Sequence, residues 1–174
     1  MRNCKKAVLT GAALACGVYA AMVLWPEVAV ARYREVIERA AARFDVDARL
    51  VRAVVRVESS GRRRARSRRG AVGLMQVLPS TAEGLAAELG LREFREEDLE
   101  DPDVNVMLGT YYLWKLCGRF GGDLALALAA YNAGPTRVSE WVRENPGIAG
   151  EALVERAAYP ETRRFVRAVL RRVL

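Results

Sequence analysis

Apolar residues recur about every 3.6 positions along most of the chain, which is the period of an amphipathic helix. In the segment 32–44, for example, one helical stripe contains Tyr33, Val36, Ile37, Ala40, Ala41 and Phe44. The same period runs through segments 47–58, 79–90, 101–116, 123–135, 135–145 and 160–174, and none of them alternates strictly as a strand does. The pattern therefore predicts an all-α domain of about six or seven helices.

Polar residues at the ends of these segments indicate where the helices begin. Asp47 and Asp101 precede helical runs as N-caps, and Pro102 suits the first helical position. Ser80 and Glu83 have the spacing of a capping box. Because the sequence shows neither an internal repeat nor a low-complexity linker within residues 32–174, we expect a single compact domain there.

Residues 1–31 differ in character from the rest of the chain. A basic start, MRNCKK, precedes the uncharged apolar run 7–25, which is typical of an export signal. The run is long enough to cross a membrane as a hydrophobic helix, which favours a retained anchor with the domain on the outer face of the cytoplasmic membrane. The less favoured alternative is cleavage after Ala31, because Ala29-Val30-Ala31 has the small-x-small pattern of a cleavage site.

The composition of the chain narrows its chemistry. The chain has no histidine, which excludes histidine-dependent triads and histidine-bound metals and leaves carboxylates as the natural acid–base groups. Its 3 cysteines, of which only Cys117 lies beyond residue 31, provide neither a disulfide framework nor a zinc cluster. We therefore expect no metal and no organic cofactor. The net charge of +7 favours anionic surroundings: nucleic acid, lipid headgroups or wall polymers.

The carboxyl of Glu58 lies in phase with the valines of its own helix. Val51, Val54, Val55 and Glu58 stand at positions i, i+3, i+4 and i+7. A glutamate packed against valines loses hydration, and this raises its pKa so that it can hold a proton near neutral pH, as a general acid must. The alternative is that Glu58 points into water and pairs with one of the arginines that follow.

The residues after Glu58 resemble those of lytic transglycosylases of the SLT type, whose fold is similar to that of goose-type lysozyme. The resemblance spans about residue 32 to the C-terminus and rests on four phrases in the order of the family. These are Glu58-Ser59 followed by Gly70–Gln76 with Pro79, Thr81 and Ala82; Asp101-Pro102 with Asn105 and Gly109; Ala129–Pro135; and Tyr159–Arg163. The phrase GLMQ alone is a weak match, but the four phrases in order are a strong one.

The resemblance implies a lysozyme-like helical domain, residues 32–174, that cleaves peptidoglycan between N-acetylmuramic acid and N-acetylglucosamine. Glu58 matches the only catalytic acid/base of the family, and the implied product is a 1,6-anhydromuramic end formed without water. The positions that match groove-lining or substrate-binding residues are Ser67, Met75, Gln76, Tyr131, Asn132, Ala133, Tyr159 and Thr162. Tyr131 matches the tyrosine that orients the catalytic carboxylate, although both Met75 and Tyr131 also suit a plain helical core.

The loop between Glu58 and the GLMQ phrase departs from the family. Family members commonly have prolines there, whereas the stretch 61–70 has none and carries the arginines Arg62, Arg63, Arg64, Arg66, Arg68 and Arg69. A solvated, charged loop is the simplest interpretation, and attraction to anionic wall polymers or stem-peptide carboxylates through Arg62–Arg69 is the functional one. Nucleic acid is not an expected partner, because no aromatic residue is interleaved for base stacking.

Two other functions fit parts of the sequence. A lysozyme-like muramidase would use water instead of an internal hydroxyl and would normally need a second carboxylate, for which the sequence offers no setting comparable to that of Glu58. A non-catalytic, membrane-anchored wall-binding module would keep the groove residues but would not need Glu58-Ser59. Product analysis distinguishes the first function from a transglycosylase, and substitution of Glu58 distinguishes the second.

Overall fold

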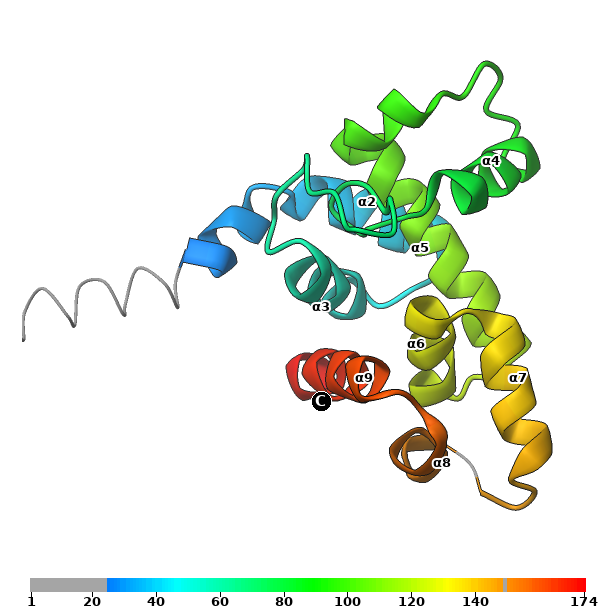
Figure 1. The fold of residues 1–174 in the computed structure, drawn as a ribbon. Coiled ribbons are helices and arrows are strands. Elements are labelled where there is room, and N and C mark those ends of the chain that lie inside the picture. Colours follow the sequence, from blue (N-terminus) through cyan, green and yellow to red (C-terminus); the bar gives the residue numbers. More distant parts are fainter. Residues whose placement is uncertain (1–24, 149) are drawn as a thin grey trace, which may run out of the picture.

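The computed structural model describes residues 25–148 and 150–174. The helices are α2 (Arg34–Phe44), α3 (Ala48–Glu58), α4 (Pro79–Glu88), the 3-10 helix η1 (Glu96–Glu100), α5 (Pro102–Arg119), α6 (Leu124–Ala133), α7 (Pro135–Glu144), α8 (Gly150–Ala157) and α9 (Pro160–Val173). Figure 1 shows their arrangement. Within the described ranges, extended pairing is limited to isolated bridges that link Val72 to Arg66 and to Val77. The all-α prediction is confirmed.

Helix α6 forms the centre of the core because it is apolar on all sides. Every residue from Ala125 to Ala130 is buried, and a helix of this kind has to be enclosed by others. Helices α5, α7, α8 and α9 pack around it, as Figure 1 shows. The C-terminal end of α6 is thereby fixed in the middle of the molecule.

Helix α3 carries the valine stripe seen in the sequence and buries it between α2 and α9. Val51, Val54 and Val55 are all buried. The helix begins where Asp47 caps it, since the carboxylate accepts a hydrogen bond from the Arg49 N–H at 2.7 Å. Its last residue is Glu58, so the buried stripe delivers that side chain to the end of the helix.

The other predicted helix ends agree with the structure only in part. Asp101 caps α5 by accepting hydrogen bonds from the N–H groups of residues 103 and 104. The predicted capping box of Ser80 and Glu83 is wrong: α4 begins at Pro79 with Leu78 as its N-cap and no capping side chain. Because Pro79 occupies the first position of the helix, Ser80 lies inside the first turn. Helix α8 was not predicted at all.

The chain already contributes to the core before residue 32. Residues 25–31 are helical, the Val30 side chain is 1% exposed, and Ala29 is buried beside it. Gly61 lies so close that a Cβ there would be 2.7 Å from the Ala29 carbonyl carbon, and Glu27 forms an ion pair with Arg56 at 2.9 Å. The folded unit therefore includes residues that a cut after Ala31 would remove.

The predicted membrane-spanning helix, residues 7–25, falls almost entirely in 1–24, outside the described residues. Among the helices that are described, none has the length and apolar character needed to cross a membrane.

Candidate active site

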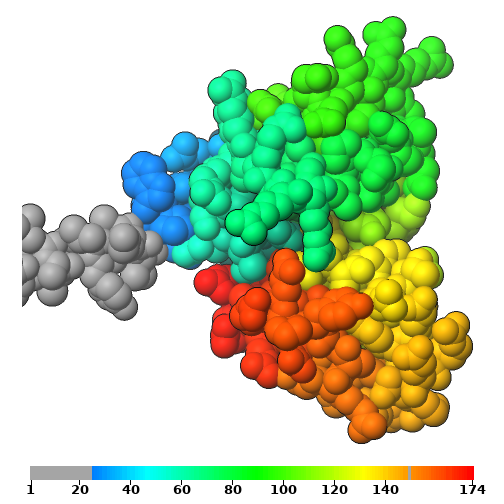
Figure 2. Space-filling view, viewed as in Figure 1, coloured from blue at the N-terminus to red at the C-terminus, as the bar shows by residue number. Residues whose placement is uncertain are grey.

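Glu58 opens into a cleft of about 780 Å³ that lies between distant parts of the chain. Figure 2 shows the teal and green residues of α3 and its following loop meeting the yellow end of α6 and the orange start of α9. The side chains and backbone around the cleft come from Glu58, Ser67, Arg68, Arg69, Ala71, Gln76, Val77, Leu78, Thr81, Tyr112, Tyr131, Asn132, Ala133, Gly134, Pro135 and Glu161.

The carboxyl of Glu58 is strongly desolvated at this position. Burial against the core raises its pKa from 4.5 to about 8, and the negative charge of Glu161 contributes in the same direction. Among the described residues no arginine forms an ion pair with Glu58, and Arg56 and Arg69 pair with Glu27 and Glu161 instead. The arrangement is that of a proton donor at neutral pH.

Tyr131 rises from α6 to the floor of the cleft. Its hydroxyl donates a hydrogen bond to the Met75 carbonyl at 2.8 Å, and therefore holds the GLMQ phrase instead of bonding to Glu58. Its ring packs against Tyr112 and Phe165, with centroids 5.4 and 6.4 Å away. Burial, followed by the charge of Glu58, raises the pKa of Tyr131 well above its usual value, so the hydroxyl keeps its proton.

Gln76 has an unusual backbone and a fixed side chain. Its φ of 49° lies in the left-handed region, where a residue other than glycine is strained. The amide Nε2 donates to the carbonyls of Ala65 and Gly73 at 3.0 and 2.9 Å. These bonds use both donors and fix the orientation of the amide, so Oε1 is the atom that remains to accept a hydrogen bond from a ligand.

The GLMQ loop is held from below by Asn105 of α5. The Met75 N–H donates to Asn105 Oδ1 at 2.8 Å, and Asn105 Nδ2 donates to the carbonyls of Val72 and Leu99 at 2.9 Å each. Gly73, at φ +85°, makes this approach possible, because a Cβ there would lie 2.1 Å from Asn105 Nδ2. The amide of Asn105 therefore fixes the position of the GLMQ loop relative to α5.

Thr162 lies behind the cleft and positions Asn132, which lines it. The Thr162 hydroxyl donates to Asn132 Oδ1 at 2.8 Å, and Thr162 itself is buried. Ser67 lines the cleft at the other side, where its Oγ accepts a hydrogen bond from the Ala71 N–H at 3.0 Å. The structure therefore gathers Glu58, Ser67, Gln76, Tyr131, Asn132 and Ala133 around one space.

Three of the predicted groove residues do not line the cleft: Thr162, which lies behind it, and Met75 and Tyr159. The Met75 side chain is 0% exposed. Its sulfur packs so closely against Gly109 of α5 that a Cβ at that glycine would lie 2.6 Å from it. Only its backbone carbonyl reaches toward the site, through Tyr131. Tyr159 packs edge-on against Trp141 with ring centroids 5.7 Å apart, is 52% exposed and does not line the cleft.

Glu161 lines the cleft as part of the Tyr159–Arg163 phrase, but the sequence did not indicate its effect on the pKa of Glu58. It lies at the start of α9, lines the cleft and pairs with Arg69 at 3.9 Å. The Tyr159–Arg163 phrase indicated that this residue borders the groove. Its effect on the pKa of Glu58 could not be predicted, because the two residues lie far apart along the chain. In the part of the chain that the structure describes, no group of three or more potential metal ligands is gathered.

Comparison with known proteins gives consistent matches. Residues 35–154 match the family described as the transglycosylase SLT domain. The soluble lytic murein transglycosylase of Salmonella typhimurium is 35% identical over 140 residues, which cover 79% of this chain and 22% of that protein. The endo-type membrane-bound lytic murein transglycosylase A of Klebsiella pneumoniae is 38% identical over 93 residues, or 51% of this chain and 46% of that protein.

Solved structures agree with these matches. The 70 kDa soluble lytic transglycosylase of Escherichia coli superposes with a TM-score of 0.75 at 34% identity, over 79% of this chain and 23% of that one. An inactive mutant of the lytic transglycosylase Slt of Pseudomonas aeruginosa gives a TM-score of 0.74 at 36% identity, over 79% and 22%. The chain thus spans less than a quarter of these soluble relatives. With its motifs, fold and cleft, this chain belongs to the transglycosylase SLT domain family.

Proposed function

We propose that this protein is a peptidoglycan lytic transglycosylase that cuts between N-acetylmuramic acid and N-acetylglucosamine with Glu58 as its single acid and base. The observation that carries the proposal is the partly buried carboxyl of Glu58, which lines a sugar-sized cleft and whose pKa is raised by desolvation to about 8. Relatives that share the domain are named soluble and membrane-bound lytic murein transglycosylases.

The first chemical step is protonation of the glycosidic oxygen by Glu58. With a pKa of about 8, roughly nine in ten molecules carry the proton at pH 7. As the bond between the muramic C1 and that oxygen breaks, the N-acetylglucosamine side leaves with the proton and positive charge develops at C1. The acetamido group of the muramic residue helps to stabilise this centre.

The second step uses the carboxylate that the first step creates. Glu58 takes the proton of the muramic C6 hydroxyl, whose oxygen bonds to C1 and closes the 1,6-anhydro ring. The acid is thereby restored without consumption of water. No second catalytic carboxylate is required, because the carboxyl that loses the proton is the one that regains it.

The residues around Glu58 would bind and orient the glycan. Gln76 Oε1 is placed to accept from an amide N–H or a hydroxyl of a sugar, since its nitrogen is already bonded to the loop. Tyr131 would act by holding the Met75 carbonyl and hence the loop. Asn132, fixed by Thr162, offers its Nδ2 donors at the opposite wall.

A hydrolytic muramidase is the second candidate, and Glu161 is the observation that favours it. This carboxylate lines the same cleft as Glu58, and a second carboxylate at a glycan cleft is what activation of a water molecule requires. Two features weigh against that role: its side chain is 65% exposed and it is paired with Arg69. A non-catalytic wall-binding module is less favoured, since such a module gains nothing from a desolvated acid.

Mass spectrometry of the products tests the proposal. Purified sacculi digested with the protein should release muropeptides that end in 1,6-anhydromuramic acid. Glu58→Gln should release none, while Glu161→Gln should still form anhydro products. Reducing ends from the unmodified protein, lost with Glu161→Gln, would instead identify a hydrolase.

We also propose that the protein is exported and keeps its N-terminal segment as an anchor on the outer face of the cytoplasmic membrane. Ala29 and Val30 support this, because both are buried in the domain that a cut after Ala31 would leave without them. The test is cell fractionation followed by N-terminal sequencing of the native protein. Recovery of a chain that starts at Arg32 would contradict the anchor.

A further inference from the structure

A second pocket adjoins the cleft on the other side of Glu58. It has a volume of about 580 Å³ and is lined by Glu58, Arg62, Arg64, Ala65, Arg66, Ser67 and Gln76. Three of these residues, Glu58, Ser67 and Gln76, also line the main cleft, so the two spaces meet at the acid. Apart from Glu58, every charged residue that lines this second pocket is an arginine.

We propose that this arginine pocket, lined by Arg62, Arg64 and Arg66, is a subsite for a carboxylate of the peptide stems that the glycan strand carries. The inference rests on the proposed function and adds to it a recognition element for the substrate. A muramic residue bears its peptide through the lactyl group, next to the bond that is cut. A strand lying across Glu58 would therefore bring a stem close to the pocket.

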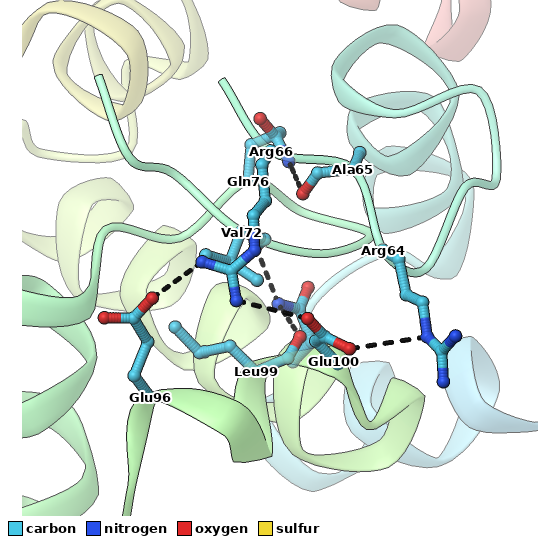
Figure 3. Close-up of polar contacts among 9 residues, drawn as sticks. Arg64, Ala65, Arg66, Val72, Gln76, Glu96, Leu99 and Glu100 are labelled. Carbon is cyan, nitrogen blue, oxygen red and sulfur yellow. Dashed lines mark hydrogen bonds and ion pairs between the residues drawn. The ribbon is translucent and has the colours of Figure 1, made fainter. Parts of the chain in front are cut away.

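The arginines are held in place before any ligand arrives. Arg66 donates to Glu96 at 2.7 Å and to Glu100 at 3.1 Å, and Arg64 pairs with Glu100 at 3.4 Å (Figure 3). Arg62 Nε donates to the Ser59 carbonyl at 3.0 Å. A guanidinium has five N–H donors, so each of these side chains keeps donors for a further acceptor while its position is restrained.

The charges in the pocket suit an anion beside the acid. Three arginines line the pocket, and Glu96 and Glu100, which pair with Arg66, do not line it. Glu58 itself is mostly protonated at neutral pH. Burial and Glu161 are the influences that set the pKa of Glu58, and both raise it. The arginines therefore line the pocket without lowering the pKa of Glu58, and a carboxylate bound to them leaves Glu58 protonated.

A built pocket favours the stem peptide over a free anionic wall polymer. Binding of a polymer that is attracted by charge alone would depend on every exposed arginine of the loop. Arg63 is one of these, because it is exposed but lines neither the cleft nor the arginine pocket. Binding of a stem carboxylate would depend only on the arginines that line the pocket. Arg63 is consequently a control matched in residue type, charge and loop position.

The experiment uses the full-length protein and two substrates: uncrosslinked glycan strands that carry peptides, and the same strands after the carboxylates of their stem peptides have been converted to neutral amides. The readout is kcat and KM for the release of anhydromuramic ends. We expect Arg62→Gln and Arg64→Gln each to raise KM about fivefold on peptide-bearing strands with kcat unchanged, as loss of one exposed ion pair allows. On the amidated strands these variants should match the unmodified protein, and Arg63→Gln should match it on both substrates.

Several results would overturn the subsite. An equal KM increase in Arg63→Gln would indicate general attraction to anionic polymers, and equal KM increases on the amidated strands would indicate contacts with groups other than the stem carboxylates. Unchanged KM values in both pocket variants would leave the arginines without a role in binding. Thermal unfolding checks that the variants fold. If Arg62→Gln proves unstable, the result for Arg64→Gln alone decides the test. Absence of anhydromuramic ends from both substrates with the unmodified protein would refute the proposed function itself.

Discussion

Replacement of Glu58 with glutamine should abolish wall cleavage and yet stabilise the folded protein at neutral and alkaline pH. Glutamine has nearly the same shape as glutamate but carries no proton to donate and no charge to bury. The residue is partly buried where the end of α3 meets the cleft, and this burial raises its pKa from 4.5 to about 8. The native glutamate therefore becomes costly to the fold whenever it ionises.

The size of the effect follows from the pKa shift. A carboxyl whose pKa is higher in the folded state binds its proton more tightly there, so its contribution to stability is complete below pH 4.5 and is lost as the pH rises through about 8. Between these limits the free energy of unfolding falls by about 1.4 kcal/mol per pH unit. At pH 7 the loss is about 3 kcal/mol, and above pH 8 it approaches about 5 kcal/mol.

Urea unfolding at pH 5, 7 and 9 measures this difference. The gain in unfolding free energy of Glu58→Gln over the unmodified protein should be under about 1 kcal/mol at pH 5 and should grow to several kcal/mol at pH 9. Glu83→Gln, the same change at an exposed position on α4, controls for the general effect of one charge. A difference that stays constant with pH would refute the argument that Glu58 is desolvated.

Three further predictions concern the packing that holds the site. Gly73→Ala should cost about 2 kcal/mol more stability than Gly70→Ala, because both glycines have similar positive φ values but only at Gly73 would a Cβ clash; equal costs by thermal unfolding would contradict the clash. Asn105→Ala should lower the free energy of unfolding by about 3–5 kcal/mol, since three buried hydrogen bonds are lost, and a loss below about 1 kcal/mol in urea unfolding would contradict it. Val30→Ala should cost about 2 kcal/mol and Val28→Ala, 61% exposed, almost nothing; similar midpoints for the two would show that Val30 does not belong to the core.

What the sequence predicted correctly depends on local geometry. The position of Glu58 on the valine stripe of α3 follows from helical spacing alone, and the N-caps at Asp47 and Asp101 are properties of the adjacent residues. The motif matches likewise indicated which loops border the cleft. The capping box at Ser80 failed because Pro79 is the first residue of the helix and Leu78 its N-cap, two positions before the N-cap that the pattern suggested.

What the sequence did not predict depends on contacts between distant segments. The pattern does not show that Met75 turns into the core while the next residue, Gln76, faces the cleft, because the left-handed backbone at Gln76 decides this. Nor does it show that Arg66 is held by Glu96 and Glu100, about 30 residues away along the chain. The effect of Glu161 on Glu58 is of the same kind, since only the packing of α3 against α9 brings them together.

The most direct measurement of the central claim is the titration of the Glu58 carboxyl itself. Carbon NMR of protein labelled at the glutamate side-chain carboxyl, with the spectrum of Glu58→Gln to assign the resonance, follows its protonation with pH. We expect a midpoint near pH 8, in agreement with a buried acid that holds its proton at neutral pH. A midpoint near 4.5, the value of an ordinary glutamate, would contradict the role of Glu58 as the proton donor.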